Sequence, residues 1–312
     1  APPLGNGPLA SRLAKPGMPR QIMDALYPSR TRHGPPPSAN RGPGWLSAQA
    51  KTGSGLLYVG DFDTSVVNIY NRRGINPAQV GQITTGISNP ERLFVDANGA
   101  LYVTDNGTAS VTVYPKGSIS PSLTITTGIS DPTGLTVDAA GTVYVTNVGN
   151  GTITEYPAGA TSPSLTIPDT GSENLATDSH ENLYSSGFYG NSSGVEVYAP
   201  GSTTGTNLGI SVGDATGIEV DRNGDIALED LAANMLDLYH AGQTQPYRQV
   251  ALSGLPFELA MNKKQGQLYA SVLVGSGFAI QRVGYPNGNA TAKLDNAGSS
   301  GWPLAVSPDN VQ

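Results

Sequence analysis

The chain has 312 residues, of which only 13% are Asp, Glu, Lys or Arg, while 40 are Gly and none is Cys. Its formal net charge is −7 and its sequence pI is about 4.9, so we expect no nucleic-acid partner. Without Cys there are no disulfides and no thiolate chemistry, and no apolar run approaches the roughly 18 residues of a membrane span. Low charge and abundant Gly favour an all-β domain of short strands joined by tight turns.

Residues 1–43 differ from the rest of the chain because ten of them are Pro. Pro keeps a segment extended and prevents long helices, so we interpret 1–43 as a Pro-rich N-terminal extension and 44–312 as one domain. The extension is expected either to lie loosely on the surface or to dock on a neighbouring copy through the apolar side chains between Ile22 and Tyr27. The second alternative predicts a homo-oligomer.

From Gly44 onward the chain repeats one unit about every 42 residues. The copy at 101–114 reads Leu-Tyr-Val-Thr-Asp-Asn-Gly-Thr-Ala-Ser-Val-Thr-Val-Tyr, in which apolar and polar residues alternate on both sides of a turn. This pattern predicts a hairpin of two strands. The six copies are 57–70, 101–114, 143–156, 183–198, 226–239 and 268–285.

A further strand flanks each hairpin on either side. In the second copy, residues 92–96 precede the hairpin and 122–125 follow it. Four-stranded units that cannot bury both faces alone pack radially around an axis. Six such units predict a six-bladed β-propeller of four-stranded antiparallel blades.

The C-terminal segment 302–309 resembles the first strand 131–138, but no second strand follows it. We predict that this segment pairs with the first blade, beside 57–70, and so closes the ring by removing an open strand edge. The segment around Trp45 competes for the same inner position, and the sequence does not decide between the two. Both Trp45 and Trp302 are expected to pack at this seam.

The motif Tyr102-Val-Thr-Asp recurs as Tyr144-Val-Thr-Asn, which follows a Pro-x-Gly-Leu-x-Val-Asp-x-x-Gly pattern. In these motifs residues 45–309 resemble the repeats of the NHL and YVTN β-propeller families. The resemblance implies the propeller fold. It does not select a function, because such propellers include lyases, lactonases, peptide-processing enzymes and adhesive or scaffolding modules.

Repeated acidic residues precede the turn between the first two strands of several copies. We interpret them as capping their own turns rather than binding metal, because each belongs to a different blade. The stretch 221–225 resembles a calcium loop but lacks the other ligands of an EF-hand. Residues 190–194 match the Gly-x-Ser-x-Gly pattern of a nucleophile elbow, but they fall between two expected strands instead of a strand and a helix. The three His residues lie elsewhere, so a Ser-His-Asp triad is not expected. The repeated residues are Asp96, Asp138, Asp178 and Asp221.

A candidate site is expected at the axis, where residues that begin the first strands meet the loops between second and third strands. Its carboxylates suit a hard divalent cation such as Ca²⁺, with a basic side chain as counter-charge or substrate clamp and aromatic side chains as an apolar wall. The other interpretation is a solvated rim on an acidic protein. The candidate ligand-binding residues are Glu91, Arg92, Glu173, Asn174, Glu258, Phe188, Tyr189 and Trp302, and the candidate metal ligands are Glu91, Glu173 and Glu258.

Two functions fit these observations. The first is a secreted or periplasmic module that binds a protein, a small molecule or a glycan without catalysis and self-associates through its extension. Its extracytoplasmic location is expected from the low charge, the Thr-, Ser- and Asn-rich composition and a chain that begins at Ala1. The alternative is a metal-assisted hydrolase or lyase of the lactonase-like kind, in which an axial cation polarises a carbonyl group. The sequence does not decide whether the protein is an enzyme.

Overall fold

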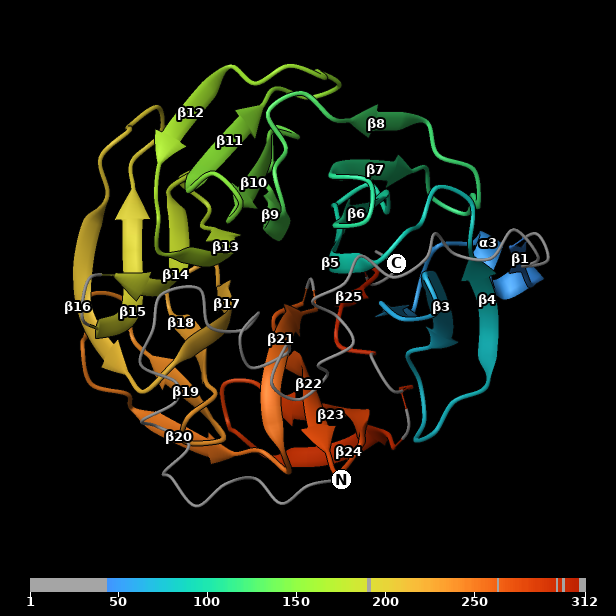
Figure 1. Cartoon of the computed structure of the whole chain (residues 1–312). Coiled ribbons are helices and arrows are strands. Elements are labelled where there is room, and N and C mark those ends of the chain that lie inside the picture. The colour runs from blue at the N-terminus through green and yellow to red at the C-terminus, as the bar shows by residue number, and fades with distance from the viewer. Residues whose placement is uncertain (1–43, 190–191, 263, 296, 299–300, 309–312) are drawn as a thin grey trace.

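The computed structural model describes residues 44–189, 192–262, 264–295, 297–298 and 301–308. Within these ranges the strands form six sheets arranged radially around one axis, and the only helix is the short α3 (Ala48–Lys51) (Figure 1). The predicted all-β, six-bladed propeller is therefore confirmed. The N-terminal extension, residues 1–43, lies outside the described residues.

Each blade takes one strand from each position of the repeat. The first strands surround the axis: β25 (Leu304–Val306), β5 (Pro90–Val95), β9 (Pro132–Val137), β13 (Ser172–Thr177), β17 (Ala215–Val220) and β21 (Leu255–Met261) (Figure 1). The second strands are β2 (Leu56–Asp61), β6 (Leu101–Asp105), β10 (Val143–Asn147), β14 (Leu183–Tyr189), β18 (Ile226–Asp230) and β22 (Gln267–Val274). The third strands are β3 (Val66–Asn71), β7 (Ser110–Tyr114), β11 (Thr152–Tyr156), β15 (Ser192–Tyr198), β19 (Met235–Tyr239) and β23 (Gly277–Gly284). The outer strands are β4 (Gln79–Ile83), β8 (Leu123–Ile125), β12 (Leu165–Pro168), β16 (Thr206–Val212), β20 (Arg248–Ala251) and β24 (Ala290–Leu294), and blade 1 adds β1 (Trp45–Leu46).

The hydrophobic core lies between neighbouring blades. Apolar side chains of one blade pack against those of the next, as where Val111 and Tyr156 join one buried cluster between blades 2 and 3. Second strands are covered on both faces, and every residue of β10 is buried. Burial of apolar area at these contacts is what holds separate sheets in one ring.

Tyrosines at the ends of third strands tie neighbouring blades together. The Tyr114 hydroxyl donates to the Thr85 carbonyl oxygen at 2.6 Å, and the Tyr156 hydroxyl donates to the Thr127 carbonyl oxygen at 2.7 Å. Each acceptor belongs to the segment that leaves the preceding blade. In blades 2 and 3, the Tyr that ends the repeated hairpin therefore bonds to the connection from the preceding blade.

Replacing Tyr114 by Phe is expected to lower the free energy of unfolding by about 1 kcal/mol, because the Thr85 carbonyl loses its donor while packing is retained. Urea unfolding followed by far-UV circular dichroism measures this change. The matched control is Tyr70→Phe, since no hydrogen bond of the Tyr70 hydroxyl is found in the described part of the chain. Equal losses in both variants would contradict the assigned role.

The ring closes through the C-terminal segment, as predicted. β25 pairs antiparallel with β2, with Leu57 opposite Val306 and Val59 opposite Leu304. The observed register is shifted by two residues from the one that aligns 302–309 with 131–138. Val306 lies opposite Leu57 in the way that Val137 lies opposite Val143 in blade 3. Ser307 consequently takes the place of the capping Asp, and its hydroxyl accepts from the Leu56 amide at 2.8 Å.

The two tryptophans have different places, so the prediction that both pack at the seam is wrong for one of them. Trp302 is 5% exposed and stacks on Phe62, with ring centroids 5.1 Å apart, so it joins the seam. Trp45 is 45% exposed and lies in β1, which pairs with the outer strand β4 through Trp45 and Gln82. The competition for the inner position is thereby decided in favour of the C-terminal segment, whose Leu304 to Val306 are fully enclosed.

Candidate functional site

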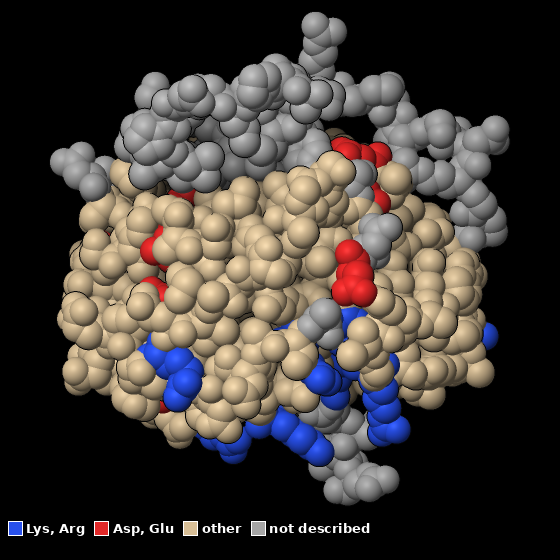
Figure 2. Space-filling view, turned by 90° about the horizontal axis from the view of Figure 1, so that it is seen from below, with Lys and Arg blue, Asp and Glu red and all other residues tan. Residues whose placement is uncertain are grey.

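The ring has two ends with different charges. One end, which we call the loop face, carries the loops between second and third strands and the connections from blade to blade. The opposite end, which we call the turn face, carries turns such as 96–100. In the view of Figure 2, Lys and Arg gather toward the lower edge of the ring, while Asp and Glu are scattered over the visible surface. Among described residues, Arg92 is the only Lys or Arg in a first strand.

Arg92 and Glu258 form an ion pair across the axis. Arg92 comes from β5 in blade 2 and Glu258 from β21 in blade 6, and their side chains are 5% and 3% exposed. A guanidinium and a carboxylate that are both removed from water are stable only when they are matched in geometry and hydrogen bonding. Two of the predicted site residues are therefore brought together at the centre of the ring.

Two more carboxyl groups surround this pair. The Glu229 side chain on β18 reaches β17, where its Oε2 accepts from the Gly217 amide at 3.2 Å and the Thr216 hydroxyl at 3.3 Å. On β17 the Glu219 Oε1 accepts from the Met261 amide of the next blade at 3.1 Å. We refer to Arg92, Glu219, Glu229 and Glu258 as the axial cluster.

A glycine makes room for Glu229. A Cβ atom added at Gly217 would lie 2.5 Å from the Glu229 Oε2, and the blade 6 backbone at Leu259 would be 2.8 Å away. Any side chain at position 217 therefore collides with the cluster or with the neighbouring blade. The pair of Gly217 and Glu229 is a unit, in which one residue creates the space that the other fills.

Burial shifts the carboxyl groups of the axial cluster toward their protonated forms. Burial raises the pKa of Glu229 to about 8 and that of Glu219 to about 7, although Arg92 lowers both. Burial also raises the pKa of Glu258 well above its usual value, against the effect of Arg92 and with further increases from Glu229 and Glu219. Desolvation disfavours the charged carboxylates more strongly than a single guanidinium can offset.

Some polar atoms in this region have no hydrogen-bond partner among the described residues. They include the Oε1 of Glu229, the Nε of Arg92, the hydroxyl of Thr104 beside Arg92 and the hydroxyl of Ser271 beside Glu258. Glu229, Thr104 and Ser271 are all fully buried. A buried polar atom without a partner loses about 1–3 kcal/mol, which a ligand or water that hydrogen-bonds to it would recover.

The free energy of unfolding is expected to fall as pH rises from about 4.5 to about 8, because in this range the folded state holds a proton on Glu229 that the unfolded state has lost. Glu229→Gln should remove the share of this fall that Glu229 contributes, on the order of 5 kcal/mol between pH 4.5 and 8, because Gln keeps the hydrogen bonds but never ionises. Glu219 and Glu258 keep the remaining pH dependence. Urea unfolding at several pH values measures it, with the exposed Glu181→Gln as control; an unchanged slope in Glu229→Gln would contradict the assignment.

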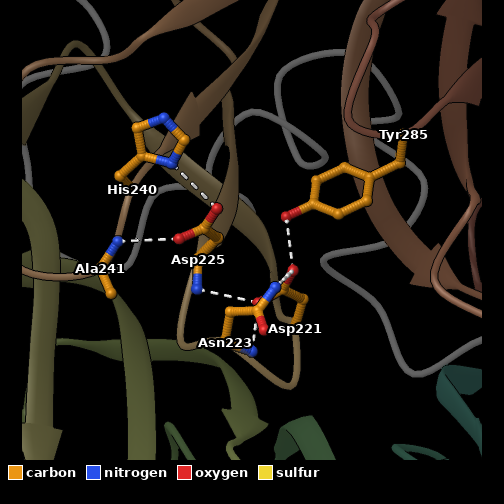
Figure 3. A network of polar contacts seen from close by, with 6 residues as sticks. All are labelled: Asp221, Asn223, Asp225, His240, Ala241 and Tyr285. Carbon is orange, nitrogen blue, oxygen red and sulfur yellow. Dashed lines mark hydrogen bonds and ion pairs between the residues drawn. The ribbon is translucent and has the colours of Figure 1, made fainter.

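The repeated aspartates cap turns, as predicted. In the stretch that resembles a calcium loop, the Asp221 Oδ1 accepts from the amides of Asn223 and Asp225 at 2.8 and 3.0 Å (Figure 3). The Asp221 Oδ2 accepts from the Tyr285 hydroxyl of the next blade at 3.2 Å, and His240 lies 3.0 Å from Asp225 (Figure 3). The acidic oxygens are thus used by the protein itself at the turn face, away from the axial cluster.

The other predicted site residues lie in separate surroundings. Asn174 is buried on β13, and its Oδ1 accepts from the Leu175 amide. Phe188 and Tyr189 are half-buried in blade 4, where the Tyr189 hydroxyl bonds Ser185. Trp302 packs in the seam between blades 6 and 1, in the same apolar cluster as Phe257 and Phe278.

The candidate metal ligands divide between two environments. Glu91 and Glu173 are half-buried at the start of β5 and β13, whereas Glu258 belongs to the axial cluster. Within the ranges that the structure describes, no group of three or more His, Asp or Glu side chains is arranged to hold a metal ion. Binding of a divalent cation stays a prediction, which elemental analysis of the dialysed protein would test.

Sequence reasoning did not select Glu219 or Glu229. The signal for Glu229 is its position within the second strand. The equivalent positions of other blades hold Thr104, Thr146, Ser186 and Ser271. A Glu where four copies place a small hydroxyl and blade 1 has Gly60 is an exception that a copy-by-copy comparison reveals. Glu219 carries no comparable signal, because the equivalent position varies widely among the blades.

No protein-family model matches the sequence, and neither does any curated protein. The fold is nevertheless found among solved structures. A chain of a nidogen/laminin complex superposes with a TM-score of 0.66 at 16% identity, over 80% of this chain and 97% of that one. A catalytically inactive virginiamycin B lyase from Staphylococcus aureus with quinupristin gives 0.53 at 11% identity, over 80% and 87%, and the selenomethionine-substituted lyase gives 0.52 at 14%, over 82% and 89%.

These comparisons and the observed sheets define the class of protein: the chain is a six-bladed β-propeller. Identities this low show the fold alone, and the same fold is seen in a protein complex and in a lyase. The resemblance to NHL and YVTN repeats is not confirmed by a family match. No helix among the described residues has the length and apolar character needed to cross a membrane.

Proposed function

We propose that this propeller is a non-catalytic binding module whose ligand approaches from the loop face and places a cationic group in the axial cluster. The observation that carries the proposal is the Oε1 of Glu229, which has no hydrogen-bond partner among the described residues although the side chain is fully buried. Three carboxyl groups there share one guanidinium, that of Arg92. An ammonium or guanidinium group supplies both the missing donor and the missing charge.

The wider role follows from the fold and the composition. A propeller of similar shape occurs in a nidogen/laminin complex, which supports a protein ligand that offers a Lys or Arg side chain. A small amine could supply the same cationic group. Low charge and a composition rich in Thr, Ser and Asn support an extracytoplasmic location, secreted or periplasmic. Self-association through residues 1–43 stays a prediction, which light scattering of the full chain would test.

The test uses arginine amide as the probe and isothermal titration calorimetry as the measurement. A cation displaces protons from the cluster, so affinity is expected to rise several-fold between about pH 6 and pH 8.5, with proton release on binding. Glu229→Gln should weaken binding and flatten its pH dependence, whereas the exposed turn-face variant Glu181→Gln should match the parent protein. Failure to bind at millimolar concentration, or equal affinity in Glu229→Gln, would overturn the proposal.

A second candidate function is a hydrolase or lyase of the lactonase-like kind. The observation that favours it is the pKa of Glu229, raised by burial to about 8, because a carboxyl group that is protonated at neutral pH can act as a general acid. The lyase neighbours support the same alternative only at the level of fold. A lactonase and lyase screen of the purified protein tests it, and any turnover must be lost in Glu229→Gln to be assigned to this site.

A further inference from the structure

The described basic residues gather at one face of the ring, although that face also carries capping aspartates such as Asp96, Asp138 and Asp178. Apart from Arg92, the described basic side chains belong to the turn face or to α3 beside it: Lys51, Arg72, Arg73, Lys116, Arg222, Arg248, Lys264, Arg282 and Lys293. The loops of the loop face, among described residues, contain no Lys or Arg. They and the adjoining strand ends carry Asp61, Asp63, Glu91, Asp131, Glu173, Asp214 and Asp230.

One carboxylate of the loop face has an unused oxygen. Asp214 is 2% exposed and lies in the connection between β16 and β17, beside Asp230. Its Oδ2 has no hydrogen-bond partner among the described residues. Burial and the charge of Asp230 raise the pKa of Asp214 to about 7. A cationic group near this connection would supply a missing donor and lower the electrostatic cost of two neighbouring carboxylates.

The same chain supplies a segment of opposite charge. Residues 1–43 contain six of the 17 Lys and Arg residues but only one of the 24 Asp and Glu residues. The basic residues are spread along the segment: Arg12, Lys15, Arg20, Arg30, Arg32 and Arg41. The extension is therefore strongly positive, while residues 44–312 are more negative than the chain as a whole.

The place where the extension joins the ring directs it to the loop face. Gly44 lies against Ile83 and Thr84, at the end of β4 where the chain runs into the first blade-to-blade connection. From there β1 runs antiparallel to β4, with Trp45 opposite Gln82, so the chain enters β1 from the loop face. An extended segment of 43 residues reaches about 140 Å, several times the radius of gyration of about 18 Å expected for a domain of this size.

We propose that the basic extension, residues 1–43, docks on the acidic loop face of its own chain. Attachment at Gly44 gives the extension a high effective concentration at this face, which favours the same chain over a second copy. The docking stands on the charges of the two parts of the chain and on the attachment point at Gly44.

Carbodiimide cross-linking of the full chain tests the docking. Lys15 is the only lysine of the extension, and zero-length coupling is expected to join it to loop-face carboxylates such as Asp63, Glu91 or Glu173. Mixing isotope-labelled and unlabelled protein separates links within a chain from links between chains. Links within one chain at low salt that fade at about 0.5 M NaCl support the proposal. Links only between chains, links to turn-face carboxylates such as Glu181, or no links of Lys15 would overturn it.

Limited trypsin digestion of the full chain gives a second readout. Cleavage after Arg20 and Arg30 is expected to become several-fold faster in the variant Asp63→Asn/Glu91→Gln/Glu173→Gln, and to stay unchanged in Glu181→Gln on the turn face. Equal rates in the two variants would overturn the docking.

Discussion

Replacing Trp302 by Ala is expected to lower the free energy of unfolding by about 3–5 kcal/mol, the usual cost of removing a large aromatic side chain from a core. Trp302 is 5% exposed and contacts Phe62 of blade 1 and Phe278 of blade 6, with ring centroids 5.1 and 5.8 Å away. Its removal therefore weakens the seam that closes the ring. Urea unfolding measures the loss, and hydrogen exchange should show earlier opening at the Gly60 amide, which donates to the Pro303 carbonyl oxygen.

The chain offers a matched control for this variant. Trp45→Ala removes the same side chain from β1, where it is 45% exposed, so the expected loss is below about 1 kcal/mol. A similar loss in both variants would show that closure does not depend on the C-terminal aromatic contact. A large loss in Trp45→Ala alone would place the weak seam at the outer edge of blade 1.

Replacing Arg92 by Met is expected to cost about 3–5 kcal/mol at neutral pH, because it leaves Glu258 buried without its cation. The same change removes the group that lowers the pKa of Glu219 and Glu229, so their pKa values should rise further. Stability should then depend on pH at higher values than in the parent protein. Urea unfolding across pH measures both effects.

The double variant Arg92→Met/Glu258→Leu gives the decisive comparison with Arg92→Met. Replacing both members of a buried ion pair by apolar side chains is often neutral for stability, so most of the loss should be recovered. A double variant as unstable as Arg92→Met would mean that Arg92 acts through packing rather than through the charge of Glu258. A loss below about 1 kcal/mol in Arg92→Met would contradict a buried pair at the axis.

Much of the fold follows from residues that can be read in order. The repeated hairpins, the Asp-capped turns and the C-terminal strand that lacks a successor specify six blades and their closure, and pairing of Leu57 with Val306 bears this out. The register in which the C-terminal strand pairs with β2 was not evident, because Ser307 stands where other copies have the Asp that marks the turn. The place of Trp45 was also not evident, since both Gly-Trp segments have the short apolar character of a strand.

The candidate site was predicted only in part. Arg92 and Glu258 begin first strands, so strand order alone brings them to the axis. Glu229 lies inside a second strand, and only the cross-strand register shows that its side chain turns toward Gly217. Burial of these carboxyl groups raises their pKa values, and it depends on how the six blades pack together. It therefore cannot be predicted from any single repeat.

The most direct test of the axial cluster is a pH titration of the full chain by carbon-13 NMR with labelled glutamate side-chain carboxyls. We expect exposed glutamates to titrate near pH 4.5 and signals from Glu229 and Glu219 to titrate near 8 and 7, assigned by Glu229→Gln and Glu219→Gln. Arginine amide should shift these late-titrating signals and lower their midpoints. Titration of every glutamate near pH 4.5, or late-titrating signals that do not respond to arginine amide, would contradict a protonated axial cluster that binds a cation.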